Sequence, residues 1–404
     1  MKRTDSSGKI ARNTLYTIGG ALVLNGVLQL LIYPQLAARL GAEQNGTMLY
    51  LMALVNTLGP SVGQALNNSR LVLRRGRSVT NGDYSAAVFL YSLIGIAGAL
   101  LFARSSLGGA AGALLTALLI LLTDFRYYGD VEYRLSLNYR RYFLYYAVCS
   151  AGYAAGFCLY RVTGNWYLIF LAGEAAALLY VAATGCIFRN VTVRSASFRL
   201  VMERGGLLVL SYFVTNLTLN IDRLFLKPAL GGEAVSVYYA ASLIGKTLVL
   251  FIAPVNTIVI SYLTKDRVRI TKKRFMKFAG IGLAVSAVFF ALCEAVTPVF
   301  IRLFYPSLAE RTQPILTVVT LSQILAMLSA YLFIVVLTFT GEIWQLILQC
   351  CHLGLVLVLI SVMTKRGGLT GFSAGVLLAN LARVAVVLAL GVVRAEKNPE
   401  AGDA

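Results

Sequence analysis

The chain has 404 residues, of which 58% are hydrophobic and only 13% are charged, and its mean hydropathy is +0.75. Roughly a quarter of the residues of a soluble globular domain are charged, so this composition excludes a water-soluble fold and indicates an integral membrane protein. Lys and Arg number 36 against 17 Asp and Glu, a net charge of +19. In a soluble chain that excess would suggest nucleic acid, but in a membrane protein topology explains it. We therefore expect no nucleic-acid partner.

Twelve apolar segments are each long enough to cross a bilayer as a helix. They are 13–33, 47–66, 84–103, 107–123, 142–160, 166–188, 205–225, 234–263, 275–297, 314–340, 343–363 and 369–393. The sequence thus predicts an all-α integral membrane protein with about 12 transmembrane helices. Its predicted parts are a cytoplasmic tail at 1–12, a six-helix bundle at 13–188, a basic cytoplasmic linker at 189–204, a second six-helix bundle at 205–393 and a cytoplasmic tail at 394–404.

The placement of basic residues predicts the orientation, because cytoplasmic loops carry the excess of Lys and Arg. With the amino terminus inside, 25 of the 36 basic residues fall on the inner side and 9 on the outer side. Arg126 is counted among the inner loop residues, whereas Lys246 and Arg383 lie within apolar segments. We therefore expect a multi-pass protein of the cytoplasmic (plasma) membrane with both termini cytoplasmic.

The two halves share a short pattern. Leu-Gly-x-Glu occurs at 40–43 and again at 230–233, each time after a proline and before an apolar run that reaches a second proline, Pro60 or Pro254. Equivalent positions in two six-span halves favour a parallel duplication of the kind that builds transporters. The alternative is that the pattern is only a common turn and helix-start signal.

Two stretches resemble a known family. Residues 34–46 read PQLAARLGAEQNG, and residues 220–233 read NIDRLFLKPALGGE, followed by Tyr238 and Tyr239. Both are similar to polysaccharide-biosynthesis flippases of the multidrug/oligosaccharidyl-lipid/polysaccharide (MOP) exporter superfamily. The resemblance implies a MATE-like fold, in which two six-helix bundles face a central cavity that opens alternately to either side of the membrane.

The resemblance also implies a cargo. In the oligosaccharide branch it is a glycan on a polyprenyl pyrophosphate, flipped from the cytoplasmic to the outer leaflet for cell-surface polysaccharide synthesis. The expected partners are the lipid bilayer, this lipid-linked glycan, and a polysaccharide polymerase or glycosyltransferases. No cofactor is expected, and coupling to protons, sodium ions or the membrane potential stays open.

Two basic residues lie deep in predicted helices, where a charge is expensive and normally faces a cavity or a partner. Lys246 and Arg383 both lie near the middle of their spans. One hypothesis is that both line a cationic cavity and hold the pyrophosphate, since Arg offers a bidentate fork and Lys a mobile point charge. The other is that either residue forms an internal ion pair with Glu174.

Uncharged polar residues on the same helices would suit a sugar. Asn25, Gln64, Asn216 and Asn220 carry amides that can both donate to and accept from hydroxyls, and Asn216 and Asn220 share one helix face. The alternative for each is an interhelical hydrogen bond. Prolines within helices remove a backbone donor, so Pro60 and Pro254 are predicted gating positions.

Enzyme signatures are missing from the sequence. His352 is the single histidine, and it stands beside Cys350 and Cys351 in an apolar run without metal-ligand spacing. We therefore predict a transporter and not an enzyme, with no catalytic or metal-binding residues. The alternative within the same superfamily is a cation-coupled multidrug exporter, which should carry acidic groups in its cavity, and a third is a non-transporting membrane scaffold.

Overall fold

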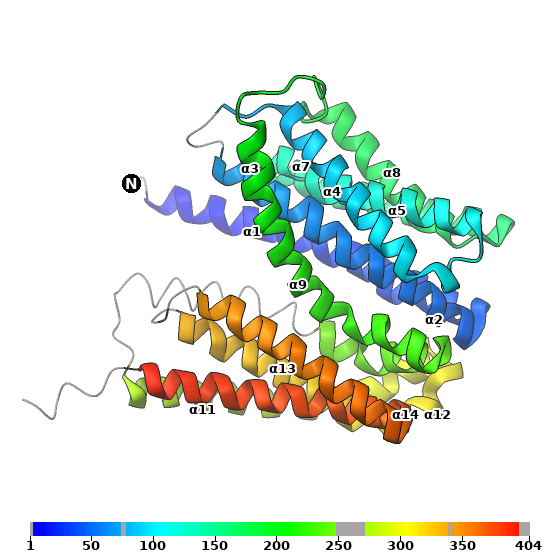
Figure 1. The fold of residues 1–404 in the computed structure, drawn as a ribbon, viewed down its shortest axis with the longest axis vertical. Coiled ribbons are helices and arrows are strands. Elements are labelled where there is room, and N and C mark those ends of the chain that lie inside the picture. Colours follow the sequence, from blue (N-terminus) through cyan, green and yellow to red (C-terminus); the bar gives the residue numbers. More distant parts are fainter. Residues whose placement is uncertain (1–2, 74–77, 248–270, 338–339, 341–342, 396–404) are drawn as a thin grey trace, which may run out of the picture. The chain divides into compact units, whose positions relative to one another are not determined.

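A computed structural model covers the chain and describes residues 3–73, 78–247, 271–337, 340 and 343–395 (Figure 1). The described residues form helices and short connections without a β-strand. Eight helical stretches of this described part are long and apolar enough to cross a membrane, and they contain ten of the twelve predicted spans. The seventh predicted span, 205–225, lies within α9 (Phe198–Leu230). Of the eighth, 234–263, residues 234–247 lie in a helix at 232–247 and the rest lie outside the described residues. The predicted all-α membrane fold is confirmed.

The chain divides into two compact units, Met1–Leu224 (unit 1) and Phe225–Ala404 (unit 2), and α9 contributes to both. The long helices of unit 1 are connected by short π, 3-10 and α segments. In chain order, its helices and connecting segments before α9 are α1 (Arg3–Gly26), η1 (Val27–Ile32), α2 (Tyr33–Gly59), η2 (Pro60–Gln64), α3 (Ala65–Leu73), α4 (Asn81–Phe102), η3 (Arg104–Ser106), α5 (Ala110–Gly129), α6 (Val131–Leu135), α7 (Tyr139–Thr163) and α8 (Tyr167–Thr184).

Small residues set the spacing of α7 and α8, which form an antiparallel hairpin closed by the left-handed Gly164. A Cβ on Gly152 would lie 2.7 Å from Ala176 Cβ, and one on Gly156 would lie 2.6 Å from the Leu168 carbonyl oxygen. Only glycine allows the backbones to approach this closely, which is how membrane helices gain packing contacts in the absence of a hydrophobic drive. α5 packs against α8 on one side and against α2 and η2 on another.

α5 is longer than the sequence predicted. The predicted fourth span ends at residue 123, but α5 continues to Gly129, and α6 begins two residues later. The assignment of Arg126 to an inner loop was therefore wrong, since Arg126 lies within α5 with its side chain 4% exposed. The helix continues because the charged residues of this stretch find partners inside the unit.

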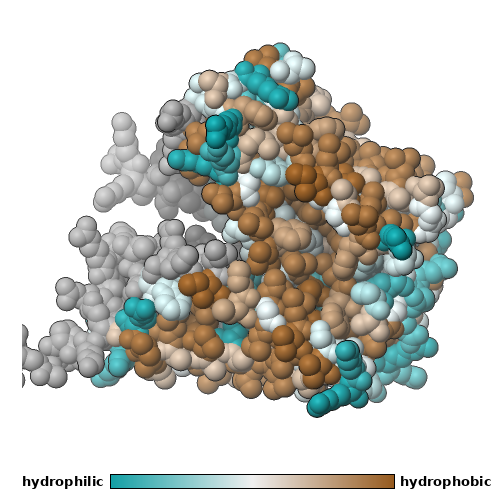
Figure 2. All heavy atoms as spheres, viewed as in Figure 1, coloured by the Kyte–Doolittle hydropathy of each residue, from teal (hydrophilic) through white to brown (hydrophobic). Residues whose placement is uncertain are grey.

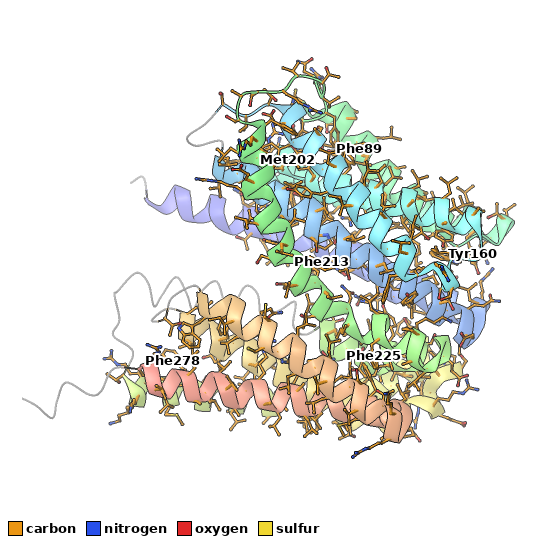
Figure 3. The ribbon with its side chains drawn as sticks, in the orientation of Figure 1. Phe89, Tyr160, Met202, Phe213, Phe225 and Phe278 are labelled. Atoms are coloured by element: carbon orange, nitrogen blue, oxygen red, sulfur yellow. The ribbon has the colours of Figure 1, made fainter. Side chains whose placement is uncertain are left out.

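Unit 2 contains fewer and longer helices in its described part. After the end of α9 and the helix at 232–247 come α11 (Lys272–Phe304), η4 (Pro306–Leu308), α12 (Ala309–Thr312), η5 (Gln313–Ile315), α13 (Leu316–Leu337) and α14 (Ile343–Arg394). α14 breaks at Gly367 and Gly368, between the eleventh and twelfth predicted spans, so it is a hairpin of two arms. Phe225, labelled in Figure 3, stacks on Phe372 of α14 with ring centroids 5.8 Å apart.

The surfaces of both units are apolar where a bilayer would contact them. Ile94 and Leu114 are 69% and 70% exposed in unit 1, and Leu283 and Val288 are 61% and 69% exposed in unit 2. Figure 2 shows hydrophobic residues over most of the visible surface. Exposed apolar area of this extent is unfavourable in water, and it suits helices that lie in lipid.

Candidate functional site

A buried ion pair crosses the interior of unit 1. The guanidinium Nε of Arg126 on α5 donates to Glu174 Oε2 on α8, and both side chains are 4% exposed. Tyr153 on α7 donates its hydroxyl to the other carboxylate oxygen, Glu174 Oε1, at 2.7 Å. The guanidinium also lies over the ring of Tyr127, 4.1 Å from its centroid. Three helices are therefore connected through one carboxylate.

A second carboxylate lies on α5 without a cation beside it. Asp124 is fully buried and accepts a 2.6 Å hydrogen bond at Oδ2 from the Ser92 hydroxyl on α4. Its other oxygen, Oδ1, has no hydrogen-bond partner in the described part of the chain. Ser92 lies eleven residues into the 22-residue helix α4, which is about 16 Å along it. The Asp124 carboxylate thus lies level with the middle of α4.

A polar seam runs between α9 and the helices η2 and α3. We define this α9 polar seam by its members, which are Ser61, Gln64, Asn68, Tyr212, Asn216 and Asn220. Asn68 Nδ2 donates to the Tyr212 hydroxyl at 2.6 Å, and Asn216 Nδ2 donates to Ser61 Oγ at 3.3 Å. The structure therefore brings three of the four predicted amides, Gln64, Asn216 and Asn220, onto one seam.

The seam has a basic residue at each end. Arg134 of α6 donates to Asn68 Oδ1 at 3.1 Å and to Asn67 Oδ1 at 2.9 Å. At the other end, Arg223 Nη2 donates to Asn220 Oδ1. The seam therefore combines hydroxyls, amides and positive charge.

The fourth predicted amide lies elsewhere. Asn25 is half-buried on α1, and its Nδ2 donates to the Ala21 carbonyl oxygen of the same helix at 2.9 Å. No hydrogen bond found among the described residues connects it to the seam. Pro60 is the first residue of the π-helical segment η2, whereas Pro254 lies outside the described residues.

In unit 2, Arg383 is half-buried on the second arm of α14. Its Nη2 donates to Gln349 Oε1 on the first arm at 3.4 Å, and His352 is close enough to interact with it electrostatically. His352 is 7% exposed. Fifteen residues separate Arg383 from Gly368 and His352 from Gly367, so both lie about 22 Å along their arms. Arg383 and His352 therefore lie at the same distance from the tip of the hairpin, on opposite arms.

The ion-pair hypothesis for the two deep basic residues is wrong in the partner it named, since Glu174 pairs with Arg126. Arg383 has no ion pair with a carboxylate among the described residues. Lys246 is half-buried, near the end of the described helix 232–247. No group of three or more metal-ligating side chains occurs in the part of the chain that the structure describes.

Sequence reasoning missed Asp124 and Arg126. Their signal was present, because two ionisable residues directly follow an apolar run that is one turn short of a full span. Glu174, an acid within an apolar helix, required a basic partner at similar depth, and Arg126 was available at the end of a neighbouring span.

The fold can now be compared with solved structures. An inward-facing multidrug resistance MATE family transporter of the MOP superfamily matches with a TM-score of 0.59 and 17% identity, over 95% of this chain and 94% of that chain. The lipid II flippase MurJ in an inward closed conformation matches with a TM-score of 0.69 and 14% identity, over 94% and 87%. A MOP superfamily transporter from Pyrococcus furiosus, whose binding pocket is described as reversed in polarity, matches with a TM-score of 0.54 and 17% identity, over 96% and 95%.

This chain has the fold of the MATE and MurJ transporters. No protein-family model and no curated protein sequence matches it. At identities of 14–17% the likeness establishes the fold, which agrees with the MATE-like architecture expected from sequence.

Proposed function

We propose that this protein is a flippase that moves an oligosaccharide linked to polyprenyl pyrophosphate across the cytoplasmic membrane by alternating access. Cell-surface polysaccharide synthesis would consume the cargo, through a polymerase or glycosyltransferases. The proposal takes the two six-helix halves as the two rocking bodies and places both termini in the cytoplasm. Its support is a fold shared with a lipid II flippase and with MATE transporters, together with the charges described above.

Arg383 is the observation that carries the proposal. It is a half-buried guanidinium about 22 Å from the tip of the α14 hairpin, and its one hydrogen-bond partner among the described residues is the uncharged amide of Gln349. A half-buried charge with no counter-ion among the described residues is costly, so its retention favours an anion that arrives with the cargo. A pyrophosphate is such an anion, and a guanidinium binds phosphate oxygens in pairs.

The α9 polar seam supports the sugar part of the cargo. Asn216 and Asn220 carry amides one turn apart on α9, with Gln64 and Asn68 on the facing segment. Amides and hydroxyls can exchange their protein hydrogen bonds for bonds to sugar hydroxyls at small cost. The seam would therefore accept a glycan without requiring a fixed sequence of sugars.

Asp124 favours a second candidate function, a cation-coupled multidrug exporter. Its carboxylate lies level with the middle of α4, and its hydrogen-bond partner among the described residues is the neutral Ser92. However, Asp124 is completely enclosed, whereas Arg383 is only half-buried. A drug would need an accessible acid, so the accessible charge of positive sign favours an anionic cargo.

Substitution of Arg383 tests the proposal. Arg383→Gln should reduce flipping of a fluorescent polyprenyl-pyrophosphate oligosaccharide in reconstituted vesicles by at least about tenfold, the loss expected for one charge-assisted contact. Arg383→Lys should retain part of the rate, because the charge persists without the fork. The flipping rate of Lys246→Ala is measured in the same vesicle assay.

Arg394→Gln is the matched control. It removes a charge from the end of the same helix, where Arg394 lies 5.4 Å from the centroid of the Trp344 ring, and should leave the rate unchanged. Membrane abundance is measured for every variant. Full transport by Arg383→Gln at normal abundance would refute the role of Arg383.

A further inference from the structure

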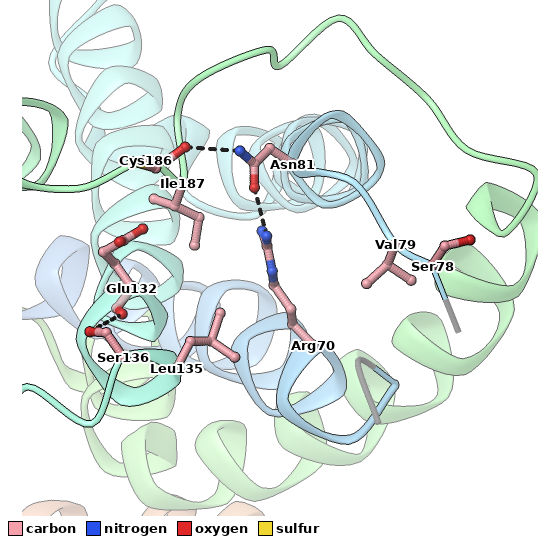
Figure 4. A pocket seen from close by; sticks show the side chains of 9 residues that line it. All are labelled: Arg70, Ser78, Val79, Asn81, Glu132, Leu135, Ser136, Cys186 and Ile187. Carbon is pink, nitrogen blue, oxygen red and sulfur yellow. Dashed lines mark hydrogen bonds between the residues drawn. The ribbon is translucent and has the colours of Figure 1, made fainter. Parts of the chain in front are cut away.

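A cavity of about 510 Å³ lies at the end of unit 1 where α3 and α6 end and α4 begins. Polar side chains from three segments line it, and Figure 4 shows the Arg70 side chain extending toward Asn81 between Leu135 and Val79. The basic-residue pattern places this end of the unit on the cytoplasmic side. None of the residues that line the cavity belongs to the α9 polar seam, so the sugar-binding role proposed for that seam does not account for it.

Arg70 gives the cavity its charge. It lies in the last turn of α3 and is 8% exposed. Nη1 donates to the Tyr128 hydroxyl and Nη2 donates to Asn81 Oδ1 at 2.6 Å. The guanidinium also lies 5.3 Å from the centroid of the Tyr84 ring. All of these partners are uncharged, so the position of the side chain is fixed while its charge is not neutralised.

The guanidinium retains unused donors. An arginine has five N–H groups, and Arg70 Nε is buried with no hydrogen-bond partner among the described residues. None of the ion pairs found in the described part of the chain involves Arg70. Buried polar atoms are normally satisfied, and a buried charge normally has a counter-ion. An anion in the cavity that accepts from the second N–H of Nη1 or Nη2 would supply that counter-ion, whereas the enclosed Nε lies out of its reach.

Neighbouring groups define the kind of anion. Ser78 contributes a hydroxyl to the lining that can donate to an oxyanion, whereas the Ser136 hydroxyl donates to the Glu132 carbonyl oxygen at 2.9 Å. Glu132 also lines the cavity, and its carboxylate would repel the anion. Arg70 with the Ser78 hydroxyl suits the tetrahedral oxygens of a phosphate group, since guanidinium and phosphate match in geometry. We propose that this cavity binds a phosphate group, supplied either by an anionic lipid headgroup or by free phosphate.

The site would be coupled to the segment between α8 and α9. Asn81, which accepts from Arg70, donates through Nδ2 to the carbonyl oxygens of Cys186 and Arg189 at 2.8 and 2.9 Å. An anion on Arg70 would hold this amide in its present orientation. Phosphate binding would thus fix residues 186–189 to the start of α4. The bound phosphate would act as a regulator of the segment that connects the two halves, and it would not be transported.

Thermal unfolding of the purified full chain tests the site. Sodium phosphate at about a hundredfold its Kd should raise the Tm by about 3 °C over sodium chloride of equal ionic strength. Glu132→Gln should tighten phosphate several-fold, because it removes a negative charge from the lining, and Ser78→Ala should weaken it. Arg70→Gln should abolish the phosphate-dependent shift. Arg199→Gln, which removes an exposed arginine, should leave the shift as in the unmodified protein.

The second arm uses phosphatidylcholine nanodiscs with and without phosphatidic acid. A shift with phosphatidic acid alone identifies a lipid headgroup as the source, and a shift with both probes identifies the phosphate group itself. If Arg70→Gln does not fold, opposite shifts in Glu132→Gln and Ser78→Ala carry the test. No shift with either probe, or an unchanged shift in both lining variants, would overturn the proposal, whatever the outcome for cargo transport.

Discussion

Arg126 and Glu174 form a buried ion pair in unit 1, so the energetic role of each residue depends on the other. The ion pair itself gives weak net stabilisation, because removing two charges from water offsets most of their attraction. Removing one partner is different, since it leaves a charge buried inside the unit without compensation. The Tyr153 hydroxyl would then be the one remaining hydrogen-bond partner of Glu174 among its present contacts.

Arg126→Leu should therefore destabilise the protein by about 3–5 kcal/mol, seen as a lower Tm and a lower membrane abundance. Arg126→Leu combined with Glu174→Leu should recover most of that loss, because both charges are absent. Arg199→Leu is the matched control: it breaks the exposed pair with Glu203, in which Arg199 is 90% exposed, and should change little. Additive losses in the double variant would show that the two residues do not act as a pair.

At the residue scale, sequence alone found three of the deep charges, and it missed Asp124 and the ion-pair partner of Glu174. Glu174, Lys246 and Arg383 stand out because each interrupts an apolar run. The partner of Glu174 could not be predicted, because Arg126 lies 48 residues away and was assigned to a loop. Pairing across helices depends on the rotation of each helix about its axis, which hydropathy does not fix.

At the element scale, the segment η2 shows how a proline alters a membrane helix. Pro60 begins a π-helical turn that ends at Gln64, because proline supplies no N–H for the regular ladder. The turn lies directly against α5: a Cβ on Gly63 would be 2.2 Å from the Asp124 carbonyl oxygen and 2.6 Å from Tyr127 Cβ. Gating at Pro60 remains a prediction.

Gly63→Ala should force η2 away from α5 and lower stability by roughly 1–3 kcal/mol, the range for overpacked interiors. The control is Gly98→Ala in α4, where an added Cβ meets nothing within 4 Å and a helix-favouring residue should be neutral or slightly stabilising. Thermal unfolding of the two variants tests this, and the Tm of Gly63→Ala should be the lower of the two. Equal Tm values for them would contradict the close contact.

The segment between α8 and α9 is attached to the start of α4. Asp83 accepts from the Ser195 backbone N–H at 2.8 Å and from the Ser195 hydroxyl at 2.6 Å, and it completes a capping box with Thr80. Thr80 also donates its hydroxyl to the Val193 carbonyl oxygen at 2.6 Å. Residues 193–195 of the predicted basic linker are therefore attached to the start of α4 within unit 1.

Asp83→Ala should release this attachment and remove a helix cap, a loss of about 1 kcal/mol for the cap alone. Hydrogen exchange of peptides covering residues 190–197 should accelerate, since local opening follows the loss of such contacts. Peptides of α7 serve as the internal reference and should not change. Unaltered exchange in 190–197 would show that the linker is held by other contacts.

Helix ends were the part of each element that sequence predicted least well. Most predicted spans differ from their helices by a few residues, as with 84–103 against Asn81–Phe102, because caps and hydrogen bonds to other segments decide where a helix ends. The capping box at Thr80 and Asp83 can be read from sequence, but the continuation of α5 to Gly129 cannot.

At the scale of the whole molecule, composition and the number of apolar runs were sufficient to predict an all-α membrane protein, whereas the MATE-like architecture was implied by the family resemblance. An apolar surface requires every backbone group to be satisfied within the helices, which leaves few architectures for twelve spans. The fold shared with MATE and MurJ transporters agrees with that prediction. The cargo could not be predicted in the same way, because one fold serves many cargoes.

Flipping by the unmodified protein in proteoliposomes tests the proposed function most directly. A fluorescent oligosaccharide on polyprenyl pyrophosphate, placed in one leaflet, should become accessible in the other leaflet at a rate that rises with the amount of protein. Vesicles with Arg383→Gln protein should resemble empty vesicles. Cation-driven efflux of a cationic dye, with no movement of the lipid-linked sugar, would contradict the flippase and favour the multidrug exporter.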